Sequence, residues 1–298
     1  MSPDDFPPGL VWLVGAGPGD PELLTRKAER LLRAADVVFH DALVGAGVLA
    51  LIPARVEQIS IGKRSGRHSK SQQAIDRLLI DAARGGRRVV RLKGGDPSVF
   101  GRSTEEISAL HRAGLRVRIC AGVTAASAVA ASAAISLTLR DEVRTLTFVT
   151  AHARADEPLD LDWNALASQR SGLAIYMGRA AAPEIARNLI VAGLAPDTPV
   201  LVAVNASLAN ERIVRGRLDA LGFLVGTISD KDPTLLLIGA MVRSTAGSIS
   251  DSECCSTSDV GKVVQMVSEQ IASEVRAPAF PARTAELKRG ASSGRGAE

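Results

Sequence analysis

The chain has 298 residues, of which 46% are hydrophobic and 23% charged, and a formal net charge of +4, a globular composition that excludes wholesale disorder. Its three cysteines, Cys120, Cys254 and Cys255, form no C-x-x-C pair, which excludes a disulfide framework or cysteine zinc site and favours a reducing compartment such as the cytoplasm. Aromatic residues make up only 3%, and no apolar run approaches about 18 residues, so neither a base-stacking platform nor a membrane span is expected.

Short runs rich in Val, Leu and Ile alternate with helix-length amphipathic stretches in the first half of the chain. The runs predict strands at residues 10–14, 36–39, 56–61, 88–92 and 117–120. The stretches between them predict helices at residues 21–34, 72–83 and 104–113, and an alanine-rich helix within 121–134. Strands separated by helices indicate an α/β fold with a mostly parallel sheet.

A polar, charged segment at residues 138–144 interrupts this pattern, and a second cycle follows it. The second cycle predicts strands at residues 146–150, 173–177, 200–205, 212–215 and 235–241, with a helix at 183–192. We therefore predict two α/β subdomains, residues 10–140 and 141–243. Residues 244–298 begin with Ser, Thr and Gly and hold one amphipathic stretch, 260–275, so we predict a mobile tail there.

Two glycine-rich loops follow predicted strands of the first subdomain. The first, residues 15–20, reads Gly-Ala-Gly-Pro-Gly-Asp, and its proline and spacing differ from the dinucleotide-binding fingerprint. The second contains Gly94-Gly95-Asp96. Asp41 and Lys63 also stand just after strands. Taken alone, the first loop also fits a tight turn, and Asp41 and Lys63 also fit surface charges. Because open α/β sheets bind ligands at the carboxyl ends of their strands, the two loops together favour a ligand site, and the two charges gain interest beside them.

Basic residues concentrate between Lys63 and Arg118. This concentration is compatible with ordinary solvated helix faces. It is also compatible with a site for a polyanion, either a nucleic acid or a small molecule with several carboxylates.

Taken in order, these segments resemble the tetrapyrrole methylases over residues 10–243. Further matching segments are Gly122-Val123-Thr124-Ala125, Tyr176-Met177-Gly178 and Val204-Asn205-Ala206. The resemblance implies two α/β subdomains of the tetrapyrrole methylase type with the ligand cleft between them, in a homodimer. It also implies S-adenosylmethionine as methyl donor, no metal, and two methylations of uroporphyrinogen III that give precorrin-2 through precorrin-1.

The resemblance assigns roles to individual residues. Asp41 matches the proton acceptor of the family, and Lys63 matches its proton donor. The positions that match donor-binding residues are Pro18, Gly94, Gly95, Asp96, Val99, Thr124, Ala125, Met177 and Ala206. The expected partner is a tetrapyrrole, with no nucleic acid and no membrane.

The sequence departs from the family at several positions. The family commonly has an aromatic residue where Ser98 stands, proline where Ala121 stands and histidine where Leu139 stands. Methylation of a later precorrin, or non-catalytic binding of a tetrapyrrole or donor, therefore stays open beside the leading interpretation. An RNA substrate also stays open because of the basic stretch, and so does the choice between siroheme and cobalamin pathways.

Overall fold

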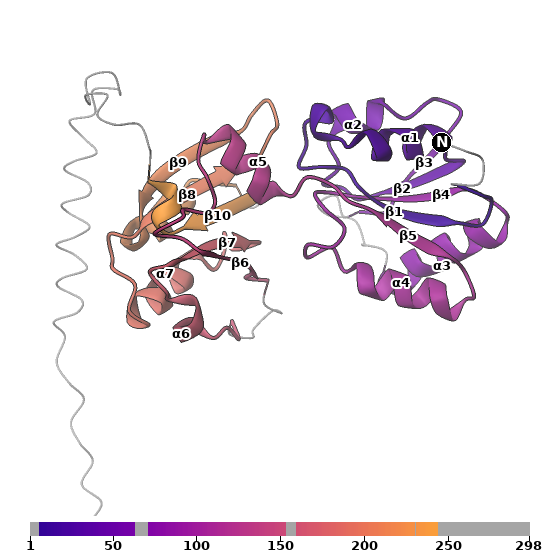
Figure 1. The fold of residues 1–298 in the computed structure, drawn as a ribbon. Coiled ribbons are helices and arrows are strands. Elements are labelled where there is room, and N and C mark those ends of the chain that lie inside the picture. Colours follow the sequence, from indigo (N-terminus) through magenta and orange to yellow (C-terminus); the bar gives the residue numbers. More distant parts are fainter. Residues whose placement is uncertain (1–5, 63–70, 153–158, 230, 244–298) are drawn as a thin grey trace, which may run out of the picture. The chain divides into compact units, whose positions relative to one another are not determined.

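The computed structural model describes residues 6–62, 71–152, 159–229 and 231–243. Within them the chain forms two five-stranded sheets with helices packed on them (Figure 1). The expected α/β class is therefore confirmed. Lys63 and residues 244–298 lie outside the described residues, and so the predicted mobile tail with its amphipathic stretch stays a prediction.

The first sheet has the strand order β3-β2-β4-β1-β5. Its strands are β1 (Val11–Gly15), β2 (Val37–His40), β3 (Glu57–Ser60), β4 (Val89–Lys93) and β5 (Val117–Cys120). Every neighbouring pair is parallel, as the alternation of strands and helices predicted. All five carboxyl ends therefore meet at one edge of the sheet.

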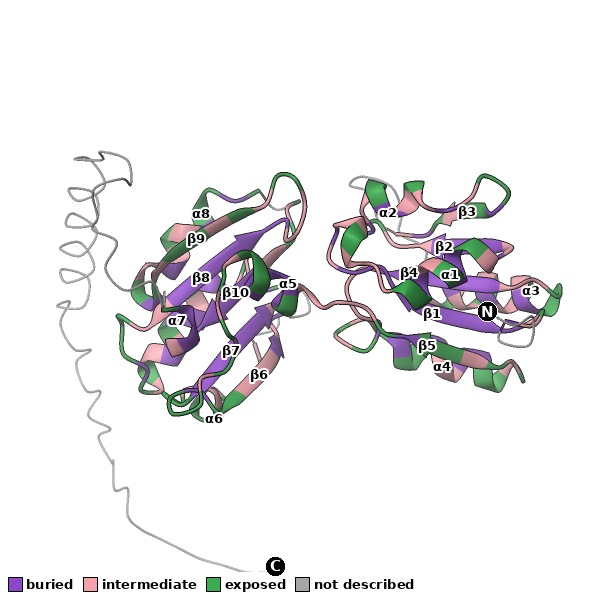
Figure 2. Cartoon of the chain, turned by 45° about the horizontal axis from the view of Figure 1, so that its top comes forward, coloured by how far each residue is buried: buried purple, intermediate pink, exposed green. Residues whose placement is uncertain are grey.

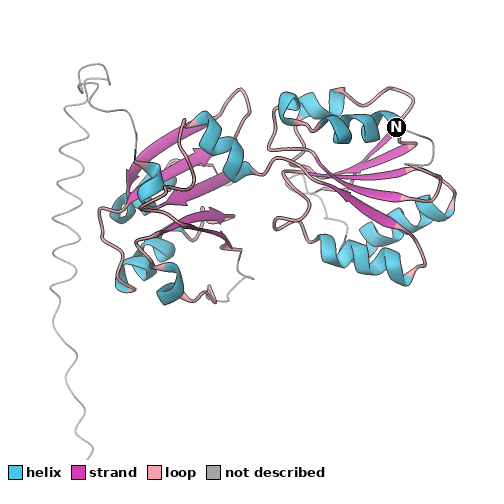
Figure 3. Cartoon of the chain, viewed as in Figure 1, coloured by secondary structure: helices cyan, strands magenta, loops and turns pink. Residues whose placement is uncertain are grey.

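Helices cover both faces of this sheet (Figure 3). They are α1 (Arg26–Ala34), α2 (Ala46–Ala50), α3 (Gln72–Arg84) and α4 (Ser103–Arg112). Leu31 and Leu32 of α1 pack with alternate residues of β1 such as Trp12, while Leu79 of α3 packs on the opposite face with residues such as Leu13. This period of two, with both faces covered, explains why β1 and β4 are buried throughout (Figure 2).

The helix predicted at residues 21–34 is two elements. A 3₁₀ turn, Pro21–Leu23, is followed by α1, which begins after Thr25. The Thr25 hydroxyl accepts a hydrogen bond from the Ala28 amide at 3.2 Å, and this N-cap starts a new helix where the sequence pattern runs on without a break.

The second sheet has the order β6-β7-β10-β8-β9 and mixed directions. Its strands are β6 (Thr145–Thr150), β7 (Ser171–Tyr176), β8 (Pro199–Val204), β9 (Arg212–Arg217) and β10 (Thr234–Ile238). Only β6 and β7 are parallel, and β10 lies antiparallel between β7 and β8. The last strand is thus inserted into the centre of the sheet, a pairing that periodicity does not reveal.

Helices also cover the two faces of the second sheet. The helices α6 (Trp163–Leu166), α7 (Ala182–Val191) and α8 (Leu221–Gly226) pack on one core, and α5 (Ala125–Ser132) packs on the other. Ala126 and Val129 of α5 share that core with Leu201 and Leu237. The alanine-rich helix thus belongs to the second sheet although it precedes residue 140, and the predicted boundary at 140 stays a prediction. In the described part of the chain, no helix has the length and apolar character needed to cross a membrane.

Candidate functional site

A cavity of about 890 Å³ is lined by loops at the carboxyl edge of the first sheet and by ends of β7, β8 and β10. Asp41 lines it. So do the nine residues that the resemblance assigns to donor binding: Pro18, Gly94, Gly95, Asp96, Val99, Thr124, Ala125, Met177 and Ala206. Lys63 is not described, but Gly62 before it lines the cavity and packs directly against Asp41 and Ala42. Residues far apart in sequence therefore converge on one space.

Three glycines, one at the end of β1 and two in the loops after β4 and β5, meet beside this cavity. A Cβ atom on Gly15 would lie 2.6 Å from the Gly122 Cα and 2.7 Å from the Gly95 carbonyl oxygen, and a Cβ on Gly122 would also collide with that oxygen. Gly17 and Gly95 exchange backbone hydrogen bonds of 2.7 and 3.2 Å. The loops after β1, β4 and β5 thus pack backbone against backbone, which only glycine permits.

Several residues of the cavity wall have a left-handed backbone. Phe100, Arg102, Met177 and Asn205 line the cavity with φ angles of 50°, 54°, 56° and 55°. Such angles are uncommon for residues with a side chain, and conformations of this kind cluster at ligand sites in proteins generally.

Asp96 links two of the glycine loops. Its Oδ1 accepts a hydrogen bond from the Ser98 amide at 2.7 Å, and its Oδ2 accepts one from the Gly122 amide at 2.8 Å. The resemblance assigns Asp96 to donor binding. Both of its oxygens here accept backbone amides, so the carboxylate also holds the two loops together.

Four charged side chains, linked to one another by ion pairs, lie against the cavity. Arg91 donates from its Nη2 to Asp41 Oδ1 at 2.6 Å and from its Nε to Glu106 Oε1 at 2.9 Å. Lys93 donates from its Nζ to Glu106 Oε2 at 2.9 Å. We call Asp41, Arg91, Lys93 and Glu106 the charge cluster. Two cations and two carboxylates balance one another in it, as buried charges require.

The surroundings of the charge cluster shift the pKa values of its cations. Burial lowers the pKa of Lys93 and the charge of Arg91 lowers it further, while Glu106 and Asp41 act in the opposite direction. Burial also acts to lower the pKa of Arg91, but Glu106 and Asp41 outweigh it and the pKa is raised. Arg91 therefore stays charged under all ordinary conditions.

Tyr176 connects β7 to the start of α5. Its hydroxyl lies 2.6 Å from Thr124 Oγ1 and accepts a hydrogen bond from the Ala126 amide at 3.2 Å. Its ring packs against Phe100 with the ring centroids 5.1 Å apart. Burial raises the pKa of the Tyr176 hydroxyl, although the Thr124 and Ala126 contacts oppose the shift. Tyr176 thus holds the segment that carries Thr124 and Ala125.

The family model of the tetrapyrrole (corrin/porphyrin) methylases matches residues 10–222. The chain belongs to the tetrapyrrole methylases. The match agrees with the resemblance found in the sequence motifs.

Among named relatives, the uroporphyrinogen-III C-methyltransferase of Pseudomonas aeruginosa is 47% identical over 79% of this methylase and 95% of its own length. Siroheme synthase 1 of Yersinia enterocolitica is 47% identical over 78% of this chain and 49% of its own length. The chain thus spans about half the length of the siroheme synthases that it matches.

Two solved structures resemble this methylase over most of its length. Uroporphyrin-III C-methyl transferase from Thermus thermophilus, complexed with S-adenyl homocysteine, has a TM-score of 0.68 and 38% identity, and the match covers 80% of this chain and 96% of that one. The cobalamin biosynthetic enzyme cobalt precorrin-4 methyltransferase has a TM-score of 0.71 and 30% identity, and the match covers 79% and 97%.

The sequence interpretation left several residues of this methylase's cavity without a role. They are Arg91, Lys93, Phe100, Glu106, Tyr176 and Asn205. A signal for two of them was present, because Arg91 and Lys93 interrupt a strand that otherwise reads Val, Val and Leu. Charged residues in a central, fully buried strand are rare without a partner, so they point to a buried acid.

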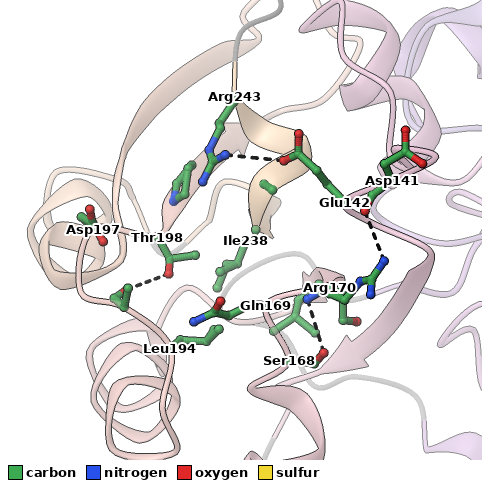
Figure 4. Close-up of a pocket in the computed structure, with 16 residues that line it drawn as sticks. Asp141, Glu142, Ser168, Gln169, Arg170, Leu194, Asp197, Thr198, Ile238 and Arg243 are labelled. Atoms are coloured by element: carbon green, nitrogen blue, oxygen red, sulfur yellow. Dashed lines mark hydrogen bonds and ion pairs between the residues drawn. The ribbon is translucent and has the colours of Figure 1, made fainter.

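A second pocket, of about 530 Å³, lies at the other end of the second sheet (Figure 4). Arg243 pairs with Glu142 at 3.5 Å, and Arg170 donates to the Asp141 carbonyl at 3.3 Å. Its charged groups include both signs, and Arg243 and Glu142 form an ion pair. Among the residues that the structure describes, neither Asp41 nor any of the nine expected donor-binding residues lines it.

Proposed function

We propose that this chain transfers methyl groups from S-adenosylmethionine to uroporphyrinogen III, twice, to give precorrin-2 through precorrin-1. One observation carries the proposal: Asp41 and the nine expected donor-binding residues line the same cavity. The 47% identity to a uroporphyrinogen-III C-methyltransferase along 95% of that relative supports the choice of substrate.

The proposed donor site is the part of the cavity formed by the glycine loops. Gly94 and Gly95, with Pro18, expose backbone to the cavity, while Thr124 and Ala125 contribute the start of α5. Met177 and Ala206 add apolar surface from the second sheet. S-adenosylmethionine supplies an electrophilic methyl group on a sulfonium, and transfer of that group depends mainly on placing the acceptor carbon in line with it.

The acceptor step needs a base. A pyrrole carbon of uroporphyrinogen III attacks the methyl carbon, the methyl–sulfur bond breaks, and its electron pair stays on sulfur. The macrocycle is left with a positive charge, which disappears when a proton departs. We assign that proton to Asp41, whose carboxylate lines the cavity and is anchored at one oxygen by Arg91. Lys63 is proposed as the proton donor.

Cationic side chains along the cavity suit the substrate. Uroporphyrinogen III carries a carboxylate on every peripheral side chain, and Arg102, Arg179 and Lys231 line the same space. Guanidinium groups bind carboxylates with two parallel hydrogen bonds. Arg102 belongs to the basic stretch noted in the sequence, which supports a substrate with several carboxylates as the polyanion.

A second candidate is methylation of a later precorrin. It is favoured by the likeness to cobalt precorrin-4 methyltransferase, although the 30% identity is lower than the 38% to the Thermus enzyme. We further propose a homodimer in the cytoplasm, and a light-scattering mass twice that of the chain would support the dimer.

The test is one assay with two substrates. Anaerobically generated uroporphyrinogen III is incubated with S-adenosylmethionine and the protein, and product mass is followed with time. A gain of two methyl groups supports the proposal. Methylation of cobalt precorrin-4 but not of uroporphyrinogen III favours the second candidate. Donor binding without either product contradicts both and leaves a binding role.

A further inference from the structure

Glu106 is the centre of the charge cluster and the most buried of its members, with 1% of its side chain exposed. Each of its two carboxylate oxygens accepts from one cation: Oε1 from Arg91 and Oε2 from Lys93. A carboxylate this deeply buried is stable only with such partners. Glu106 also lines the cavity, but both of its carboxylate oxygens are occupied by these two cations.

Arg91 is fixed at three of its atoms. Its Nε donates to Glu106, its Nη1 donates to the Leu92 carbonyl at 3.1 Å, and its Nη2 donates to Asp41. A planar guanidinium bound at three points has no freedom to rotate, so the atom that meets Asp41 is fixed as well. The side chain of Asp41, in contrast, is 29% exposed and faces the cavity.

We propose that Glu106 is a positioning residue: it holds the Arg91 guanidinium and through it sets the orientation of the Asp41 carboxylate. This inference rests on the proposed function, in which Asp41 accepts the proton released after methyl transfer. Glu106 touches neither donor nor acceptor in this scheme. Its effect on the reaction therefore requires Asp41.

A double-mutant cycle on the full chain tests that dependence. Single-turnover rates with uroporphyrinogen III are measured for the wild type, Glu106→Gln, Asp41→Asn and the double variant. We expect Glu106→Gln to slow the wild type by about 10- to 100-fold, as loss of an orienting partner does, with KM nearly unchanged. In the Asp41→Asn background the same change should slow the reaction by less than about 3-fold, because the group being oriented is gone.

Equal factors in the two backgrounds would overturn the proposal, since they would mean that Glu106 acts on folding alone. Affinity for S-adenosylhomocysteine, measured by calorimetry, reports whether each variant retains the donor site. The matched control is Glu57→Gln, which breaks an ion pair with Arg87 at the opposite edge of the same sheet and should keep the wild-type rate.

A charge-balanced variant addresses the possibility of misfolding. Glu106→Leu/Lys93→Met removes one acid and one base together and fills the space with apolar groups, so no unpaired charge stays buried. We expect this variant to fold and to bind donor. It should still methylate slowly, because Arg91 has lost the Glu106 carboxylate that fixes its orientation. Lys93→Met alone measures the share of that loss that belongs to Lys93. A wild-type rate in the balanced variant would overturn the proposal.

Failure of the proposed function gives a different pattern. If the wild type does not methylate uroporphyrinogen III, the substrate assignment is wrong, but the same four proteins still test the network by thermal unfolding. Glu106→Gln must then shift Tm by unequal amounts with and without the Asp41 carboxylate, because groups in one ion-pair network are not additive. Equal shifts would show that Arg91 does not couple them.

Discussion

The two edges of the first sheet carry the same kinds of ion pair in opposite environments. At the amino edge Arg88 binds Asp36 through both of its carboxylate oxygens, with 41% and 36% of the two side chains exposed. At the carboxyl edge Arg91 binds Asp41 and Glu106, and only 4% of Arg91 is exposed. The contacts are equally short, so their length does not distinguish a functional pair from a surface one.

The surroundings make the distinction. The carboxyl edge also holds the packed glycines and the left-handed residues of the cavity wall, and the second sheet contributes to the same cavity. At the amino edge the paired groups face water, which screens their charges. We therefore expect that only substitutions at the carboxyl edge lower the activity or cause large losses of stability.

The largest expected effect separates Asp41 from Asp36. Asp41→Asn should lower the methylation rate by about 10²- to 10⁴-fold, the usual range for loss of a proton-transfer group. Asp36→Asn removes an arginine-paired carboxylate at the amino edge and should retain the wild-type rate. Product mass under single-turnover conditions measures both, and equal rates would remove the functional difference between the edges.

Stability should separate Glu106 from Glu57. Glu106→Gln leaves two buried cations against one carboxylate, so the free energy of unfolding should fall by about 3–5 kcal/mol. Glu57 is 52% exposed, and Glu57→Gln should cost less than about 1 kcal/mol. Urea unfolding measures both. A small loss for Glu106→Gln would mean that water reaches the charge cluster.

Glycine packing gives a third, smaller contrast. Gly122→Ala places a methyl group against the Gly95 carbonyl and the Gly15 Cα, which should cost about 1–3 kcal/mol and weaken donor binding. Gly85 ends α3 near the amino edge, with a φ of −70°, and its added methyl group would make only ordinary contacts of 3.4 Å. Gly85→Ala should change the free energy of unfolding by less than about 1 kcal/mol. Equal losses of stability in both variants would argue against the close backbone packing of Gly122 on Gly15 and Gly95.

The smallest expected effect is a pH dependence at the amino edge. The hydrogen bond from the Arg88 side chain holds the pKa of Asp36 below its ordinary value of 3.8, although burial opposes the shift. Because the folded pKa is the lower one, the stabilisation is complete well above pH 3.8 and is lost as the pH falls through the folded pKa. The difference in unfolding free energy between wild type and Asp36→Asn should be less than about 1 kcal/mol at neutral pH and should vanish in acid. A difference that grows in acid would contradict this assignment.

Much of the fold followed from local pattern. The first sheet's strands were predicted within two residues of their observed ends, because each lies in a short stretch with Val, Leu or Ile between helix-length segments. The short helices α2, α6 and α8 were not predicted. Each is six residues or fewer, too short to show a helical period. The N-cap at Thr25 was missed because the amphipathic pattern continues through it.

The sequence by itself determined the α/β class and the family, because strand–helix alternation and ordered motifs are local properties of the chain. It also pointed to Asp41 and the donor-binding residues, whose positions in the cavity agree with the resemblance while their roles stay a proposal. Only the tertiary structure decided that β10 pairs between β7 and β8, and that Arg91 reaches Asp41 and Glu106 at once. The pairing of distant strands and the contact between Arg91 and Asp41, which are 50 residues apart in sequence, depend on how the whole chain packs. A local sequence pattern does not contain that information.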